Sequence, residues 1–162
     1  MNIRYISKFV FWMAGLLLVF PAYGQTRPSD LKCSAVGGVM STDLGAVDQQ
    51  TTMGVSTGDL KGAVSATILD VTANPDGTVS FVVQHHFVTE SGDMISFGPA
   101  TAVTQPVSST RYAILDYPVT IKGGSGKYTN ATGQLNSIGE VDLGSGQTVF
   151  RYSGKLCLAS AD

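Results

Sequence analysis

Hydrophobic and polar residues alternate along most of the chain after residue 30, with the two-residue period of a β-strand. Turn residues separate the alternating runs, among them the Asn-Pro-Asp-Gly segment at 74–77 and the glycine-rich segment at 143–146. No segment after residue 30 has a sustained helical period flanked by capping residues. The runs predict strands over 33–40, 60–72, 78–89, 94–97, 100–105, 111–122, 133–142 and 147–158. Residues 41–57 are weakly patterned and predict a loop or a short strand with turns.

About eight strands at a spacing of roughly ten residues predict an all-β domain, either an antiparallel sandwich or a barrel. Pro118 lies inside one of the long predicted strands. Because proline has no backbone N–H to donate to a neighbouring strand, we expect Pro118 at a bulge, a bend or a sheet edge.

The first 24 residues have the layout of a secretory signal peptide. Arg4 and Lys8 precede an uncharged apolar run over 9–20, and small residues follow at alternate positions up to Gly24. A transmembrane helix needs about twenty apolar residues, so this run is short for a span, although a retained membrane anchor is the alternative. We therefore expect export to the periplasm or the medium, and a single mature domain over 25–162.

The charge balance argues against a nucleic-acid partner. The chain has 10 Lys and Arg against 12 Asp and Glu, and loss of Arg4 and Lys8 with the signal peptide would leave a net charge of −4. No basic cluster occurs that could neutralise phosphates. We expect no nucleic-acid partner and no membrane span after signal cleavage.

Two cysteines, Cys33 and Cys157, lie near the two ends of the mature domain. In an oxidising compartment they predict a disulfide. A redox pair or a set of metal thiolates would need closer spacing or further ligands, which the sequence lacks. A bond between the first and last predicted strands also suits a closed barrel, in which those strands are neighbours.

A glycine-rich segment carries a family resemblance. The residues Gly123-Gly124-Ser125-Gly126-Lys127-Tyr128, followed by Ala131-Thr132-Gly133, resemble the G-G-[ST]-G-x-[YF]-x-x-A-x-G motif of allene oxide cyclases and plant dirigent proteins. Weaker matches lie at 86–88, 92–95, 117–121 and 152–156, so the resemblance runs from about 78 to 158. With its signal peptide, the chain looks like a secreted bacterial relative of this barrel superfamily.

The resemblance implies one closed antiparallel barrel of eight strands with a mostly apolar lumen, often assembled as a homotrimer. Members bind an apolar or aromatic small molecule and steer the cyclisation or coupling of a reactive intermediate. Segment 33–59 contains no motif onto which the catalytic residues of allene oxide cyclases can be carried, and the acidic and arginine residues of dirigent proteins have no unambiguous counterpart. The resemblance therefore implies the fold and leaves open whether the chain is an enzyme. If it is an enzyme, the resemblance implies an isomerase or cyclase.

His85 is the candidate catalytic residue. In strand 78–89 the odd positions are the more apolar and are expected to face the lumen, which places His85 inside and His86 outside. A lumenal imidazole could act as a general base or donate a hydrogen bond to a ligand oxygen. The alternative is a core histidine satisfied by a neighbouring group. Because adjacent histidines on a strand point apart, we expect no metal site, and no motif indicates a cofactor.

Four aromatic residues are candidates for contact with an apolar ligand. The odd face of strand 78–89 contributes Phe81 and Phe87. Strand 111–122 contributes Tyr112, although the sequence does not decide which face of that strand is inside. Tyr128 follows the glycine turn, where packing across the end of the barrel is the alternative role.

Two functions from different classes remain open. The first is binding of an apolar small molecule in the lumen, with an isomerase, cyclase or dirigent-type role. The second is a non-catalytic structural or interaction protein of the bacterial envelope, with a lumen filled by its own side chains. Small residues facing inward would leave a cavity, and converging aromatic residues would close it. The small residues in question are Ala63, Ser65 and Ala102, and the aromatic residues are Phe81, Phe87, Phe97, Tyr112 and Phe150.

Overall fold

The computed structural model describes residues 31–160, so the predicted signal peptide lies outside the described residues. Within 31–160, no helix combines the length and the apolar character needed to cross a membrane. Nine strands follow one another along this part of the chain, with one short 3-10 turn, η1 (Gly126–Tyr128), after the seventh. The strands are β1 (Leu31–Asp48), β2 (Thr51–Gly58), β3 (Gly62–Ala73), β4 (Val79–Thr89), β5 (Met94–Phe97), β6 (Ala100–Pro106), β7 (Arg111–Gly124), β8 (Thr132–Asp142) and β9 (Gln147–Ala159).

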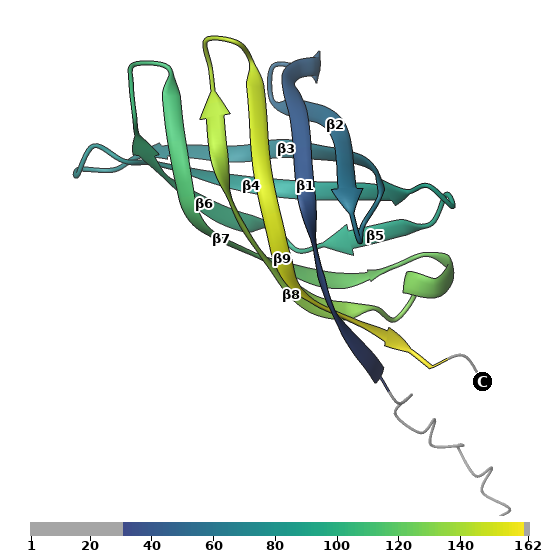
Figure 1. Ribbon diagram of the computed structural model, residues 1–162. Helices are drawn as coiled ribbons and strands as arrows, with labels where there is room; N and C mark the ends of the chain where they lie inside the picture. Colours follow the sequence, from purple (N-terminus) through teal and green to yellow (C-terminus); the bar gives the residue numbers. More distant parts are fainter. Residues whose placement is uncertain (1–30, 161–162) are drawn as a thin grey trace, which may run out of the picture.

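The strands form one antiparallel sheet that closes on itself. Pairing runs from β3 through β2, β1, β9 and β8 to β7, and then through β5 and β6 to β4, which pairs back to β3. β5 and β6 share one position in this ring, because each pairs with β4 on one side and with β7 on the other. The ring therefore has eight positions, and the predicted closed antiparallel β-barrel is confirmed (Figure 1).

Of the two alternatives for 41–57, the strand is the one that the structure contains. The second half of β1 and the whole of β2 cover this segment and pair with each other across the turn after Asp48. β2 also pairs along its length with β3. Pairing on both sides decides the conformation of a segment whose own hydrophobic pattern is weak, because strand propensity depends strongly on tertiary context.

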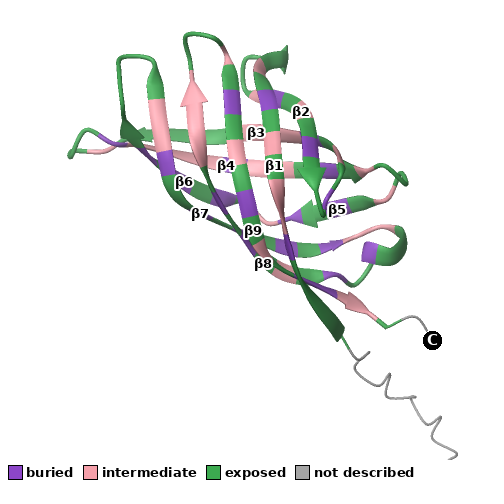
Figure 2. Cartoon of the chain, viewed as in Figure 1, coloured by how far each residue is buried: buried purple, intermediate pink, exposed green. Residues whose placement is uncertain are grey.

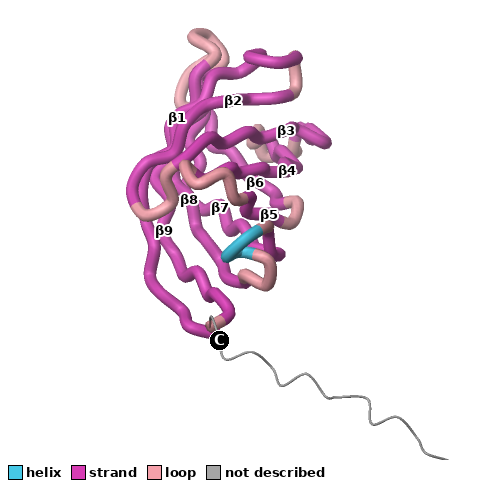
Figure 3. Tube along the Cα trace, turned by 90° about the vertical axis from the view of Figure 1, so that its right-hand side faces the viewer, coloured by secondary structure: helices cyan, strands magenta, loops and turns pink. Residues whose placement is uncertain are grey.

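The strand directions give the barrel two different ends. The hairpin turns β1–β2, β3–β4, β6–β7 and β8–β9 lie at one end, which we call the open end. The connections β2–β3, β4–β5 and β7–β8 lie at the other, the closed end, with the start of β1 and the finish of β9. In Figure 1 three of the open-end turns stand at the top, and the terminal parts of β1 and β9 lie together at the lower right. Figure 3 shows η1 in cyan beside β5 and β7, at the closed end.

Side chains fill the lumen in the closed half of the barrel. Along most of β9, buried residues are separated by exposed or half-buried ones, as the purple, green and pink bands of Figure 2 show. The inward side chains of the closed half are almost without solvent contact and come from nearly every strand or its adjoining loop; they include Leu60, Phe87, Ile95, Ile121, Leu135 and Tyr152, each 1–2% exposed.

Tyr152 fixes the β2–β3 loop at the closed end. Its hydroxyl accepts a hydrogen bond from the backbone N–H of Leu60 at 2.9 Å and donates one to the carbonyl of Thr57 at 3.0 Å. Gly38 on β1 leaves room for the tyrosine ring, because a Cβ at this position would collide with the ring and with the Thr57 carbonyl. The β2–β3 loop is therefore held to the barrel wall by a buried side chain.

The predicted disulfide between Cys33 and Cys157 is confirmed. The two residues are directly opposite each other in the register of β1 and β9, with Cα atoms 3.9 Å apart. The bond closes a loop with a sequence separation of 124 residues. It lies at the closed end, where the first and last strands of the barrel meet.

Candidate functional site

The open half of the barrel encloses a cavity of about 110 Å³. Its walls are mainly apolar, and none of the described residues that line it is Asp, Glu, Lys or Arg. The lining residues include Phe81, His85, Ala102, Tyr117, Ser137 and Phe150.

The cavity opens at the end that carries the four hairpin turns. Leu143, in the β8–β9 turn, lines the cavity and is 51% exposed, and Val141 beside it is half-buried. Deeper in the barrel, Ala102 and Ile114 line the same cavity and are 2% exposed. Exposure therefore falls from the mouth to the floor, and the floor rests on the packed closed half.

Acidic side chains surround the mouth. Three turn aspartates have pKa values held below the ordinary value of 3.8, mainly by a hydrogen bond from the Gln50 backbone for Asp48, from the Thr78 side chain for Asp76 and from the Gly144 backbone for Asp142. Among the described residues, the open end carries six carboxylates against one guanidinium, that of Arg111, which pairs with Glu140 at 2.7 Å. The six are Asp43, Asp48, Asp70, Asp76, Glu140 and Asp142.

A histidine and a tyrosine meet at the floor of the cavity. His85 on β4 faces Tyr117 on β7, with the imidazole Nε2 3.4 Å from the phenol oxygen and the ring centroids 5.5 Å apart. Phe97 packs edge-on against the imidazole, and Phe150 lies against the tyrosine ring. The polar edges of both rings therefore meet inside an aromatic surround.

Burial keeps this pair uncharged at neutral pH. Loss of solvation, with a smaller contribution from the charge of His86, lowers the pKa of His85 from 6.5 to about 4. Burial also raises the pKa of Tyr117 well above its ordinary value of 10.0. A general base works best with a pKa near the working pH, so His85 is better suited to hydrogen bonding than to removing a proton.

A β-bulge in β7 places Tyr117 inside. Ile114 is opposite Gly139 of β8, but Tyr117 is opposite Ser137, so β7 has one residue more than β8 between these pairs. Regular alternation from Ile114 would point Asp116 and Pro118 inward and Tyr117 outward. The extra residue reverses the alternation: Tyr117 is 4% exposed, whereas Asp116 and Pro118 are exposed.

Asn136 of β8 stabilises the bulge. Its Oδ1 accepts a hydrogen bond from the Tyr117 backbone N–H at 2.8 Å, and its Nδ2 donates to Oδ1 of Asp116, also at 2.8 Å. The side-chain amide thus replaces the backbone hydrogen bonding between β7 and β8 at the point where the bulge interrupts it. Pro118 follows directly after Tyr117, so the expectation that it lies near a bulge is confirmed.

Three hydroxyl-bearing residues on the cavity wall differ in whether a partner is present. Thr42 and Thr148 are buried and hydrogen-bonded to each other, with their oxygens 2.7 Å apart. Ser137 is 7% exposed and lines the cavity, but its hydroxyl has no hydrogen-bond partner among the described residues. The Thr pair is satisfied within the protein, whereas Ser137 is not.

A second, smaller cavity of about 30 Å³ lies deeper in the barrel. It shares Met40, Val64, His85 and Ser137 with the first cavity and extends toward the packed closed half. His85 and Ser137 therefore stand at the junction of the two cavities, and they are the polar residues among those that line the second one.

The two predicted ligand contacts on β4 are placed at different depths. Phe81 lines the main cavity, whereas Phe87 is 1% exposed and lines only the second one. His85 lines both cavities and His86 is exposed, as the odd–even alternation of this strand predicts. Whether any of these residues contacts a ligand or takes part in catalysis stays a prediction.

The other two predicted ligand contacts, Tyr112 and Tyr128, line neither cavity. Tyr112 is half-buried and lies near the start of β7, opposite Pro106 and Val141. Tyr128 is 5% exposed in η1 and packs into the core of the closed half, with the ammonium of Lys127 5.0 Å from its ring centroid. Its position agrees with the alternative of packing across the end of the barrel.

Two of the three small residues that could have left a cavity by facing inward lie on the other face of β3. Ala63 is exposed and Ser65, two residues along, shares its face, whereas Val64, Ala66 and Ile68 line the cavity. Small residues occupy both faces of this strand, so hydrophobicity alone did not distinguish them. Ala102 on β6, the third of these residues, does line the cavity.

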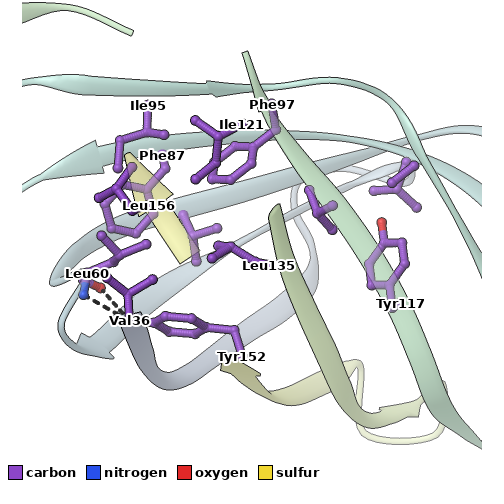
Figure 4. Close-up of a cluster of buried hydrophobic side chains, with 14 of the residues drawn as sticks. Val36, Leu60, Phe87, Ile95, Phe97, Tyr117, Ile121, Leu135, Tyr152 and Leu156 are labelled. Carbon is purple, nitrogen blue, oxygen red and sulfur yellow. Dashed lines mark hydrogen bonds between the residues drawn. The ribbon is translucent and has the colours of Figure 1, made fainter. Parts of the chain in front are cut away.

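The converging aromatic residues fill only one half of the lumen. Phe87 and Phe97 pack below the cavity, and Phe81 and Phe150 form part of its wall. In Figure 4 the side chains of Phe87, Ile95 and Leu156 lie close together, and Tyr117 stands apart from them. The two lumen arrangements that the sequence left as alternatives thus occur together, one in each half of the barrel.

Residues 31–160 contain no group of three or more His, Cys, Asp or Glu side chains placed to hold a metal ion. No protein-family model matches the chain, and a search of curated proteins finds no match. Among solved structures, the chain is similar to the pterocarpan synthase dirigent protein GePTS1, with a TM-score of 0.36 and 13% sequence identity over 95% of this chain and 100% of that one. The barrel follows from the strand pairing of this chain, and the cavity from its own side chains.

Proposed function

We propose that the open half of the barrel binds a small, uncharged and mainly apolar molecule that carries a hydrogen-bonding atom. The observation that carries the proposal is the cavity itself: an apolar pocket, open at one end, with the His85–Tyr117 pair at its floor. Binding pockets commonly combine apolar walls with a few placed polar groups. A filled structural barrel would not need such a space in half of its lumen.

The cavity sets the size of the buried part of the ligand. A closed apolar cavity of about 150 Å³ accepts benzene in a well-studied protein. The volume of about 110 Å³, open at the mouth, therefore suits one ring or a short branched chain. A larger ligand would project between the turns at the open end.

The lining also supports an uncharged ligand. A buried carboxylate or ammonium group needs a partner of opposite charge, and the lining provides none. A role in steering a cyclisation or coupling, of the isomerase or dirigent type, is compatible with this site. A shaped, dry pocket can orient a reactive intermediate without supplying a strong acid, base or nucleophile. We also propose that the protein is exported and assembles into a homo-oligomer. Its main partner is the apolar small molecule.

The first test is native mass spectrometry of the protein purified from its own host. A retained mass of a few hundred daltons would support the proposal and give a molecule to identify. Titration with single-ring compounds, followed by two-dimensional NMR, then locates the site. The variant Ala66→Leu fills the cavity and should abolish binding, whereas Ala63→Leu changes the outer face of the same strand and should not. Equal binding by both variants, or no binding by the wild type, would favour the structural alternative.

A further inference from the structure

We propose that His85 and Ser137 form a polar subsite at the floor of the cavity, which takes one uncharged oxygen atom of the ligand, a hydroxyl or a carbonyl. This inference rests on the proposed function and adds the orientation of the ligand: the oxygen enters first and the apolar body follows.

The first argument is an imidazole nitrogen without a partner. Among the described residues, Nδ1 of His85 is the one side-chain nitrogen or oxygen that has no solvent contact and makes no hydrogen bond. Nearly all such atoms in folded proteins are paired with protein groups or with ordered water. The other ring nitrogen, Nε2, already faces the phenol of Tyr117. Nδ1 is therefore left to bind something other than the protein.

The second argument is the hydroxyl of Ser137. It has no partner among the described residues, and Ser137 lines both cavities together with His85. The register places Ser137 directly opposite Tyr117, the residue that contacts the imidazole. The two residues that carry these unpaired groups thus line the same small cavity, although they come from β4 and β8.

The third argument is volume. A cavity holds a water molecule when it has room for about one probe sphere and offers polar partners. The second cavity has about 30 Å³ and its polar lining residues are these two. It has room for one water or for one ligand oxygen, while the ring of the ligand stays in the main cavity.

The chemistry of the two groups defines the ligand. A neutral imidazole offers a donor or an acceptor at Nδ1, depending on the tautomer, and a serine hydroxyl offers both. Either a hydroxyl or a carbonyl oxygen can therefore be satisfied. A carboxylate cannot, because burial keeps His85 neutral at pH 7 and no cationic side chain lines either cavity.

The test compares 4-methylphenol with toluene, which differ by one hydroxyl. The wild type should bind 4-methylphenol about tenfold more tightly, the size expected for one or two net hydrogen bonds. Ser137→Ala should bring the ratio of the two affinities close to one. It should change the affinity for toluene by less than about twofold. Affinities can be measured by NMR titration or by calorimetry.

Two substitutions of His85 separate its nitrogens. Asparagine places its amide near the position of Nδ1, and glutamine near that of Nε2. His85→Asn should therefore retain more of the preference for 4-methylphenol than His85→Gln. The variant Ser153→Ala is the matched control, because it makes the same substitution on the outer face of β9, at an exposed residue that lines neither cavity. It should leave the preference unchanged.

The outcomes distinguish this inference from the proposed function. Binding of both compounds with equal affinity, or a preference that survives Ser137→Ala, overturns the subsite and leaves a simple apolar pocket. Binding of neither compound overturns the proposed function as well. Because Ser137→Ala is a small change, it tests the subsite even if the His85 variants fail to fold.

Discussion

Nε2 of His85 and the phenol oxygen of Tyr117 lie 3.4 Å apart across the floor of the cavity, although the residues are 32 positions apart in the chain. The imidazole reaches this point because β4 alternates regularly, and the phenol because β7 does not. The pair is held among aromatic rings, where neither group is charged at neutral pH. It marks the boundary between the packed half of the barrel and the open half.

The buried imidazole predicts a specific pH dependence of stability. Unfolded protein takes up a proton on His85 near pH 6.5, whereas the folded protein does so only near pH 4. The contribution of His85 to the free energy of unfolding is thus fully present above pH 6.5 and is lost as the pH falls toward 4. The loss has a limit of about 3 kcal/mol. Urea unfolding followed by circular dichroism at pH 7 and pH 4.5 measures the loss.

The variant His85→Gln isolates this contribution. Glutamine does not titrate, so the decrease in the free energy of unfolding between pH 7 and pH 4.5 should be smaller in the variant. The turn aspartates Asp48, Asp76 and Asp142 have lowered pKa values and affect stability at more acidic pH, equally in both proteins. An identical pH dependence in the two proteins would show that the folded state does not suppress protonation of His85.

The amide of Asn136 should stabilise the bulge that turns Tyr117 inward. Asn136→Leu removes its two hydrogen bonds at the bulge, each with a heavy-atom distance of 2.8 Å. We expect a loss of about 1–3 kcal/mol in the free energy of unfolding and weaker ligand binding, because the backbone N–H of Tyr117 loses its partner. Gln134→Leu is the control, since Gln134 is exposed on the same strand and its side chain makes no such contact. Equal effects of the two substitutions would argue against a special role for Asn136.

The local sequence pattern was sufficient for the strands, left a sandwich and a barrel as alternatives, and was insufficient for the site. Alternation and turn residues located most strands, because each strand has one face in the lumen and one in solvent. Tyr117 was missed as a cavity residue because a bulge reverses the alternation of β7, and a bulge depends on the register with β8. Pro118 was the one local signal of an irregularity there. It marked the place without indicating which side chain would turn inward.

The depth of each residue along the barrel axis could not be predicted either. Phe81 and Phe87 have the same face and the same chemistry, yet one lines the main cavity and the other packs below it. Which half of the lumen is filled depends on how side chains from all eight positions meet, and the sequence pattern of one strand does not contain this information. The same holds for Ser137. Nothing in its own strand distinguishes it, and only the register with Tyr117 and the shared cavity with His85 identify it as a candidate.

The acidic mouth should discriminate among ligands of different charge. Anions approaching the cavity meet a potential set by six carboxylates, so benzoate should bind more weakly than benzyl alcohol, by at least about tenfold at low salt. The discrimination should shrink as salt is raised from about 20 mM to 500 mM, because screening shortens the range of the rim charges. The difference in affinity that persists at high salt measures the free-energy cost of placing a carboxylate in an uncharged cavity.

Charge variants separate the rim from the cavity floor. Asp43→Asn/Asp70→Asn removes two rim charges and should lower the salt dependence for benzoate, without changing the affinity for benzyl alcohol. Glu90→Gln, an exposed position in the β4–β5 turn at the closed end, is the matched control. A salt dependence that is the same in both variants would mean that the rim does not act on the ligand.

The disulfide should affect stability without affecting the cavity. Cys33→Ser/Cys157→Ser releases the cross-link between β1 and β9, and we expect a loss of about 2–5 kcal/mol in the free energy of unfolding, because the unfolded chain gains the freedom of a long open loop. The bond lies at the closed end, separated from the cavity by the packed core around Tyr152 and Leu60. Under conditions where the variant is folded, its affinity for single-ring ligands should therefore equal that of the wild type. A weakened affinity in the folded variant would mean that the closed half does not isolate the cavity from the ends of the chain, and that the core transmits changes at β1 and β9 to the His85–Tyr117 floor.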